Sequence, residues 1–244
     1  MMDKDYGQWL KEMEADSRAK QEQFMNRIAG RLKRPRLQEA PPRAFRGAPD
    51  YWREFAWSPE EKLNRFAENF TSAGGHVVRL ADMEAAKTFM LGKAEEMKAR
   101  YILRQNDPAL AELRLETALA ASGARLSVWN TDAEEPWIAR AAEADFGIVM
   151  ADCAVAYTGS LVVKSSPEKG RSVSLLPTVL IAVVPVERMK TRLGEVLDEF
   201  DEAGRSALPA GIHFISGPSR FADIENDLTI GVHGPGVVFA LLVG

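Results

Sequence analysis

The sequence predicts an α/β fold in which a mainly parallel sheet is covered by helices on both faces. Short apolar runs rich in Val and Ile, such as 146–150 and 179–184, are typical of strands buried on both sides. These runs alternate with segments of helical length along most of the chain. Several of them follow one another between Asp145 and Pro185, so we expect the centre of the sheet there.

Composition limits the class of protein. The 244 residues suffice for one large α/β domain with an appendage, and the net charge of −4 argues against a dedicated nucleic-acid surface. Cys153 is the single cysteine, which excludes an internal disulfide and an iron–sulfur cluster held by this chain alone. The N-terminus lacks the apolar core of a signal peptide, and the longest apolar run is too short to span a bilayer. We therefore expect a soluble, cytoplasmic protein.

Residues 1–50 are expected to form a helical arm and a proline-bearing tether, separate from a domain at 51–244. Phe24, Ile28 and Leu32 recur every four positions, which is typical of a narrow apolar helix face. Prolines at 35, 41, 42 and 49 then prevent a continued helix. The arm packs on its own domain or on a second copy, or alternatively docks on a different protein or an anionic surface. The aromatic residues expected to pin the tether to the domain are Tyr51, Trp52, Phe55 and Trp57.

The domain is predicted to begin with a helix at 59–73, with Ser58 as its N-cap and Pro59 at its first position. Further helices are expected at 82–98, 108–121, 136–142 and 187–200, and strands at 76–80, 101–103 and 126–129. From Gly147 onward the strands follow one another closely, which predicts hairpins in or beside the sheet. The last strands are expected at 212–215, 228–232 and 237–243.

Small and charged residues at strand ends are the first ligand-binding candidates. A glycine between hydroxyl-bearing residues lets backbone N–H groups approach an anion. From such a short motif alone, however, a plain turn is the favoured interpretation. The residues concerned are Thr158, Gly159 and Ser160. In the polar run 165–172, Lys169 and Arg171 flank Gly170, and two such cations suit a phosphate or carboxylate. A solvated hairpin tip has the same composition.

Two later loops carry further candidates. One contains Ser216, Gly217, Ser219 and Arg220 between a strand and a short helix expected at 222–225. Asp223 and Glu225 in that helix are candidate bases, or alternatively helix-capping residues. The glycine-rich turn 231–236 holds His233, a candidate for proton transfer or simply a hydrogen-bonding partner of the turn. The three histidines lie far apart without ligand-like spacing, so no metal site is expected.

Two separate groups of motifs resemble the LUD domain of the lactate utilization protein C family. The first includes Ala144-Asp145-Phe146-Gly147-Ile148, Ala151-Asp152, Thr158-Gly159-Ser160-Leu161 and Ser174-Leu175-Leu176-Pro177. The second includes Ser216-Gly217-Pro218-Ser219-Arg220 and Gly231-Val232-His233-Gly234-Pro235. The resemblance covers roughly residues 58–244 and implies a Rossmann-like fold similar to that of ribose-phosphate isomerases and CoA transferases. Tyr157 stands where the family commonly carries a glutamate.

The resemblance implies a subunit of a lactate utilization system that oxidises L-lactate to pyruvate with iron–sulfur partner proteins. Such a subunit would bind a small organic acid or other anionic ligand, with the clusters in its partners and its own cofactor unknown. A stand-alone enzyme for a phosphorylated, CoA-type or folate-type small molecule is an alternative, as is a non-catalytic scaffold. A homodimer is compatible with the sequence. We expect the loops at 158–160, 169–171 and 216–233 to form one shared polar hollow.

Overall fold

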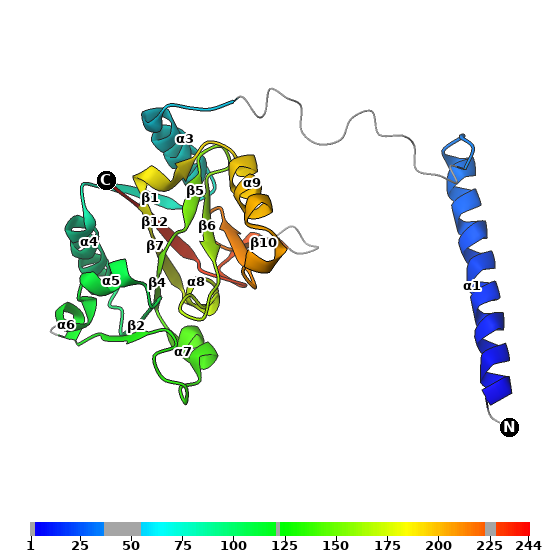
Figure 1. Cartoon of the computed structure of the whole chain (residues 1–244), viewed down its shortest axis with the longest axis horizontal. Coiled ribbons are helices and arrows are strands. Elements are labelled where there is room, and N and C mark those ends of the chain that lie inside the picture. Colours follow the sequence, from blue (N-terminus) through cyan, green and yellow to red (C-terminus); the bar gives the residue numbers. More distant parts are fainter. Residues whose placement is uncertain (1–2, 37–54, 121–122, 223–227) are drawn as a thin grey trace. The chain divides into compact units, whose positions relative to one another are not determined.

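The computed structural model describes residues 3–36, 55–120, 123–222 and 228–244 (Figure 1). The chain divides into two compact units, Met1–Pro49 and Asp50–Gly244. The first contains one long helix, α1 (Asp3–Arg31), and the second contains the α/β domain. In the described part of the chain, no helix combines the length and the apolar character needed to cross a membrane.

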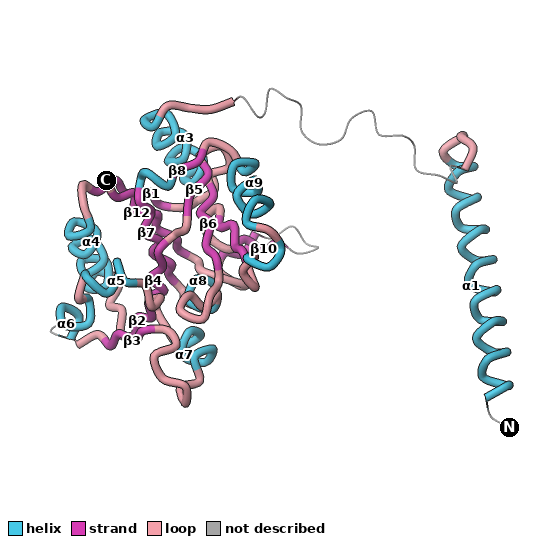
Figure 2. Tube along the Cα trace, viewed as in Figure 1, coloured by secondary structure: helices cyan, strands magenta, loops and turns pink. Residues whose placement is uncertain are grey.

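A six-stranded parallel sheet forms the centre of the domain, which confirms the predicted fold class (Figure 2). Its spatial order is β1-β12-β7-β4-β2-β3. The strands are β1 (His76–Leu80), β2 (Tyr101–Arg104), β3 (Arg125–Val128), β4 (Phe146–Met150), β7 (Val179–Pro185) and β12 (Val237–Val243). Because β4 and β7 are buried along nearly their whole length, their sequences are almost continuously apolar.

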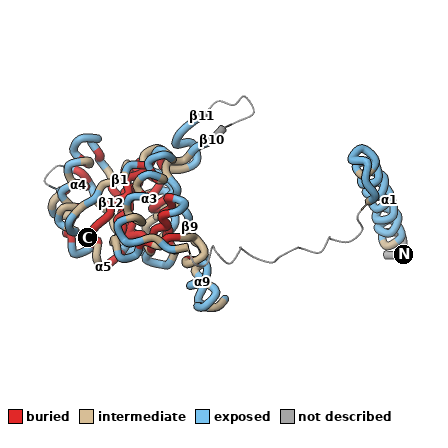
Figure 3. Tube along the Cα trace, turned by 90° about the horizontal axis from the view of Figure 1, so that it is seen from above, coloured by how far each residue is buried: buried red, intermediate tan, exposed pale blue. Residues whose placement is uncertain are grey.

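Each face of the sheet carries its own layer and its own apolar core (Figure 3). Helices α4 (Met83–Glu96), α5 (Pro108–Glu112) and α6 (Leu115–Ala120) pack on one face. The other face is covered by α3 (Pro59–Ser72), α7 (Trp137–Glu143), α8 (Ser172–Leu175) and part of a second sheet. Ser58 caps α3 as predicted, since its hydroxyl accepts a hydrogen bond from the Glu61 N–H.

The second sheet has the order β8-β5-β6-β9 and confirms the predicted hairpin after β4. Its strands are β5 (Cys153–Val155), β6 (Ser160–Lys164), β8 (Met189–Lys190) and β9 (Ile212–Ile215). The prediction of a continuous helix at 187–200 is wrong. The segment begins with a 3₁₀ turn, η1 (Val186–Arg188), and strand β8, and the helix α9 follows at Leu193–Ala203. The reason is tertiary, because β8 pairs with β5.

The prediction of a short helix at 222–225 is also wrong for its first residue, because Ala222 belongs to a strand. Strand β10 (Arg220–Ala222) pairs antiparallel with β11 (Leu228–Ile230), and this pairing requires extended backbone. Asp223 and Glu225 lie outside the described residues. The strand expected at 228–232 ends at Ile230, since Gly231 adopts a φ of 81° that a strand does not allow.

Phe55 and Trp57 anchor the start of the domain, as predicted. Their rings make an edge contact with centroids 4.9 Å apart, and each lies 6.0 Å from the ring of Tyr157. Tyr51 and Trp52 lie outside the described residues.

Candidate functional site

The connections that leave β2 and β4 depart to opposite faces of the sheet. The connection after β2 enters the core that contains α5 and α6, whereas the connection after β4 enters the core that contains β5 and β6. Because β2 and β4 are neighbours, this divergence makes a topological switch point at their carboxyl ends. Ligands of open α/β sheets bind at such points.

Lys169 occupies this switch point between two carboxylates. Its ammonium lies 3.1 Å from Asp107 Oδ2 and 3.8 Å from Asp152 Oδ1. Asp107 follows β2 and also caps α5, accepting a hydrogen bond from the Ala109 N–H at 3.0 Å. Asp152 follows β4 and accepts a 2.7 Å hydrogen bond from the Lys164 N–H. These contacts join the ends of two neighbouring strands to the loop at 165–171.

Gln105 adds an amide to the same place. Its side chain is fully buried, and its Oε1 accepts a 3.0 Å hydrogen bond from the Met150 N–H at the end of β4. Its Nε2 is buried and has no hydrogen-bond partner among the described residues. A buried donor without a partner costs about 1–3 kcal/mol. The switch point therefore holds a donor that a ligand or an ordered water would stabilise. We name Lys164, Lys169, Gln105, Asp107 and Asp152 the switch-point cluster.

Hydrogen bonds tie the backbone of the loop at 165–171 to the sheet, although Ser166, Pro167 and Glu168 at its tip are exposed. The Asn106 N–H donates to the Glu168 carbonyl at 3.0 Å, and the Trp129 indole N–H donates to the Pro167 carbonyl at 3.1 Å. Gly170 packs directly against the indole of Trp129. A Cβ added to Gly170 would fall 2.0 Å from Trp129 Cε2. Gly170 is therefore required for close packing against Trp129.

Arg171 acts electrostatically on His213 of β9. Burial lowers the pKa of His213 below its ordinary value of 6.5, and the positive charge of Arg171 lowers it further. The His213 Nδ1 is buried without a hydrogen-bond partner in the part of the chain that the structure describes. Both observations favour a neutral imidazole.

The turn at 158–160 contacts helix α3. Gly159 has a φ of 58°, and a Cβ there would fall 2.7 Å from the Phe70 backbone nitrogen. Gly217 approaches the same helix end, because a Cβ would fall 2.9 Å from the Ala73 carbonyl oxygen. The Ser160 and Ser216 hydroxyls lie 2.7 Å apart, so the structure brings these two predicted loops together. Both glycines are explained by the approach of helix backbone.

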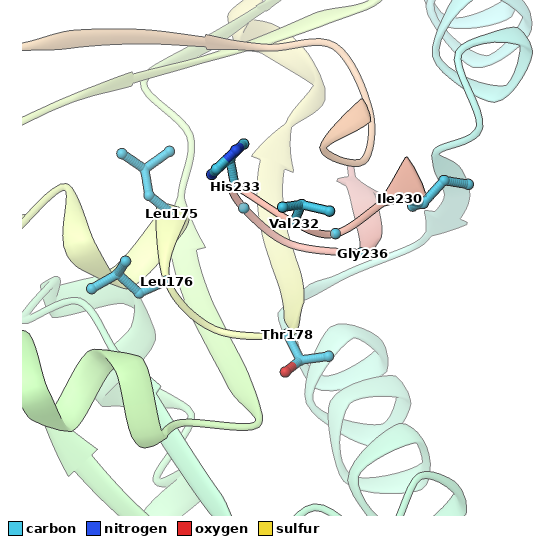
Figure 4. A pocket seen from close by; sticks show the side chains of 9 residues that line it. Leu175, Leu176, Thr178, Ile230, Val232, His233 and Gly236 are labelled. Atoms are coloured by element: carbon cyan, nitrogen blue, oxygen red, sulfur yellow. The ribbon is translucent and has the colours of Figure 1, made fainter. Parts of the chain in front are cut away.

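His233 lies at the amino-end edge of the sheet, beside a hollow of about 580 Å³ (Figure 4). The hollow is lined by Leu175, Leu176, Thr178, Ile230, Gly231, Val232, His233, Gly234 and Gly236. Hydrogen bonds fix its glycine-rich turn: the Gly236 N–H donates to the Thr178 carbonyl and the Gly231 N–H to the Ser219 carbonyl, both at 2.9 Å. The hollow combines exposed aliphatic side chains with one imidazole.

The expectation of one hollow shared by all three loops is wrong. Lys169 follows the carboxyl ends of β2 and β4, whereas His233 precedes the amino end of β12, and these strands run parallel. The two residues therefore lie at opposite edges of the sheet. Ser219 does reach the His233 turn, since its N–H donates to the Pro235 carbonyl at 2.9 Å. Arg220 lies near the end of α3, where a Cβ on Gly74 would fall 2.6 Å from its Nη2.

Sequence reasoning missed Gln105, Asp107 and Asp152 as site residues. Each lies within three residues after the end of a strand, which was the available signal. Their convergence depends on β2 and β4 being neighbours, although more than forty residues separate them.

Cys153 lies within β5. Burial raises the pKa of its thiol to about 11, so the thiol stays protonated at neutral pH. Within the described ranges, no three His, Cys, Asp or Glu side chains gather as a metal ion would require.

The family model of the LUD domain matches residues 63–243, which is well over half of the chain. This chain belongs to the LUD domain family. Lactate utilization protein C of Halalkalibacterium halodurans is 34% identical over 224 residues, covering 88% of this chain and 94% of the relative. Lactate utilization protein C of Bacillus subtilis is 33% identical over 230 residues, with coverage of 88% and 92%.

A solved structure supports the fold of this LUD chain. The crystal structure of a DUF162 family protein from Deinococcus radiodurans superposes with a TM-score of 0.55 at 20% identity. The match covers 77% of the LUD chain and 99% of that chain.

Tyr157 has a packing role in this LUD domain. Besides its ring contacts with Phe55 and Trp57, its carbonyl accepts a 3.1 Å hydrogen bond from the Asn69 amide, which also donates to the Ala156 carbonyl. The aromatic ring thus packs on the start of the domain, while the backbone carbonyl of Tyr157 ties the 158–160 turn to α3.

Proposed function

We propose that this chain acts in lactate utilization, as a subunit of a cytoplasmic system that oxidises L-lactate to pyruvate together with iron–sulfur partner proteins. The observation that carries this proposal is the similarity to proteins named Lactate utilization protein C, at 33–34% identity over 88% of the chain.

The chemistry requires a division of labour between subunits. Oxidation of L-lactate removes two electrons and two protons, as the C–H and O–H bonds break and the C=O bond of pyruvate forms. Iron–sulfur clusters that accept such electrons need several thiolates, whereas Cys153 is the single cysteine of this chain. The electrons therefore pass to clusters in partner proteins. This chain contributes binding and orientation of the small acid.

The switch-point cluster suits a hydroxy acid with one carboxylate. Lys169 would donate to that carboxylate, and the buried Gln105 amide would donate to the same group. The hydroxyl would donate to Asp107 or Asp152, which positions either carboxylate to accept its proton. Two ammonium groups already balance two carboxylates here, so a phosphate dianion would meet more repulsion than lactate.

Reconstitution with the iron–sulfur partners tests the proposal. L-lactate oxidation is measured with and without this chain, and with Lys169→Met. Lys190→Met is the matched control, because Lys190 is also ion-paired, with Glu199, but lies outside the switch-point cluster. We expect loss of activity without the chain and with Lys169→Met, and retention with Lys190→Met. Unchanged oxidation in the absence of the chain would refute the proposed function.

A second candidate function rests on the hollow beside His233. Its volume of about 580 Å³ lies in the range of sites for drug-sized ligands and exceeds what a three-carbon acid fills. A stand-alone enzyme acting on a CoA-type or folate-type molecule would use this hollow. Thermal unfolding of the isolated protein with CoA esters, folates and sugar phosphates discriminates, since a ligand at 100 times its Kd stabilises by about 2.7 kcal/mol. If none of these compounds raises the unfolding temperature, this candidate function is refuted.

A further inference from the structure

Helix α1 and the residue that follows it expose large apolar side chains in two clusters, one near each end of the helix. One cluster contains Tyr6, Trp9, Leu10 and Met13, and the other contains Phe24, Met25, Ile28 and Leu32. These side chains are between 38% and 62% exposed. A single helix gains most of its stability from packing an apolar face, so these clusters require a partner surface.

Most of these side chains lie on one face of α1, with Trp9 and Met25 at its two margins. An α-helix has about 3.6 residues per turn, so positions eleven or eighteen residues apart return to nearly the same side. Met13 and Phe24 are eleven residues apart, and Tyr6 and Phe24 are eighteen apart. Polar Ser17 and Gln21 continue the face between the clusters.

We propose that this face pairs with the same face of a second copy of the chain, with the two helices antiparallel. The clusters are placed symmetrically about a midpoint between Arg18 and Ala19. An antiparallel partner centred there sets Met13 level with the partner copy's Phe24, and Trp9 level with its Ile28. A two-fold axis makes such an interface self-complementary, because each surface meets its own copy.

The charges of the arm favour the same arrangement. Residues 3–16 contain five acidic and two basic residues, whereas residues 17–36 contain seven basic residues and one acidic residue. Antiparallel pairing sets the acidic half against the basic half, and parallel pairing would set like charges together. Asp16 and Lys20 form an ion pair of 2.7 Å within one helix and would lie opposite their counterparts across the two-fold axis.

The shape of the two helix ends is also complementary. Beyond Arg31 the chain turns back and forms a notch of about 80 Å³, lined by Met25, Ile28, Ala29, Leu32, Arg34, Pro35 and Arg36. At the opposite end, the rings of Tyr6 and Trp9 stack with centroids 5.7 Å apart. In the antiparallel pair this aromatic stack faces the notch of the other copy. The arginines at the notch would then contact aromatic rings.

The molar mass of the full chain in solution gives the first test. Light scattering during size-exclusion chromatography is expected to give twice the 27.0 kDa chain mass. Trp9→Ser and Ile28→Ser, made separately, are expected to raise the dimer dissociation constant roughly tenfold or more. Ala15→Ser on the opposite side of α1 is the matched control and should leave it unchanged. A monomer at every concentration overturns the proposal, even if α1 then binds an iron–sulfur partner.

Thiol cross-linking tests the geometry. The native Cys153 is buried and its thiol has a pKa raised to about 11, so an introduced surface cysteine is the reactive one. Ser17→Cys lies on the paired face near the midpoint, and Ala19→Cys lies on the back of the helix at the same level. We expect disulfide-linked dimers for Ser17→Cys and few for Ala19→Cys.

Direction is tested by mixing two variants. Met13→Cys and Phe24→Cys are expected to cross-link when mixed and to remain single chains when oxidised alone. Efficient self-linking of Met13→Cys would show parallel helices, and equal linking of Ser17→Cys and Ala19→Cys would show that another face forms the contact. Either result overturns the antiparallel pairing. Both tests are independent of lactate chemistry.

Discussion

Gly170→Ala is expected to loosen the loop that carries Lys169. The added methyl group would fall 2.0 Å from Trp129 Cε2 and 2.1 Å from Cζ2, where ordinary contacts lie at 3.4–4 Å. The indole must therefore move by about 1.5 Å, and overpacking of this kind costs about 1–3 kcal/mol. That movement also breaks the hydrogen bond from the Trp129 N–H to the Pro167 carbonyl, worth about 0.5–1.5 kcal/mol. The total is about 1.5–4.5 kcal/mol.

Urea unfolding followed by tryptophan fluorescence measures this loss as a change in the free energy of unfolding. Gly92→Ala provides the matched control, because Gly92 is exposed within α4 and a Cβ there meets nothing within 4 Å. That control should stabilise the protein by about 0.5–1 kcal/mol through helix propensity.

A double-mutant cycle identifies the cause. In the Trp129→Ala background the methyl group of Gly170→Ala meets no indole, so its destabilisation should shrink to a fraction of the value in the wild type. A loss for Gly170→Ala that is below about 0.5 kcal/mol, or one that persists without the indole, would refute the packing role of Gly170.

Three further changes test other contacts. Gly159→Ala should destabilise the domain by about 2–4 kcal/mol in urea unfolding, because it combines a φ of 58° with a Cβ 2.7 Å from the Phe70 nitrogen. Glu116→Ala should cost about 2–4 kcal/mol by leaving the buried Arg104 guanidinium without the carboxylate 2.6 Å away, whereas Glu60→Ala at the exposed Arg79 pair should stay within about 1 kcal/mol. The folded protein binds a proton at His213 less readily than the unfolded chain, whose pKa is near 6.5, so the free energy of unfolding should fall as pH drops below that value. His213→Gln should remove part of that fall, and an unchanged pH dependence would contradict the assignment.

Local signals in the sequence determined most of the elements. Ser58 and Pro59 define the start of α3, and the apolar run at 179–184 defines a central strand, because capping and burial impose residue types over a few neighbouring positions. These local signals fail where a segment pairs with a strand that is distant in the sequence. Arg220–Ala222 is extended because it pairs with Leu228–Ile230, and Met189–Lys190 is a strand because it pairs with β5.

The sequence alone placed the candidate site in glycine- and hydroxyl-bearing loops and identified the loop that carries Lys169. It did not show that Gly159 and Gly170 serve close packing, since their neighbours, Phe70 and Trp129, are far away along the chain. Only the tertiary structure brought Lys169 to Asp107 and Asp152 and separated it from His233. The order of strands decides which loops share an edge of the sheet, and that order is fixed by pairing between segments far apart in the chain rather than by the residues of any one loop.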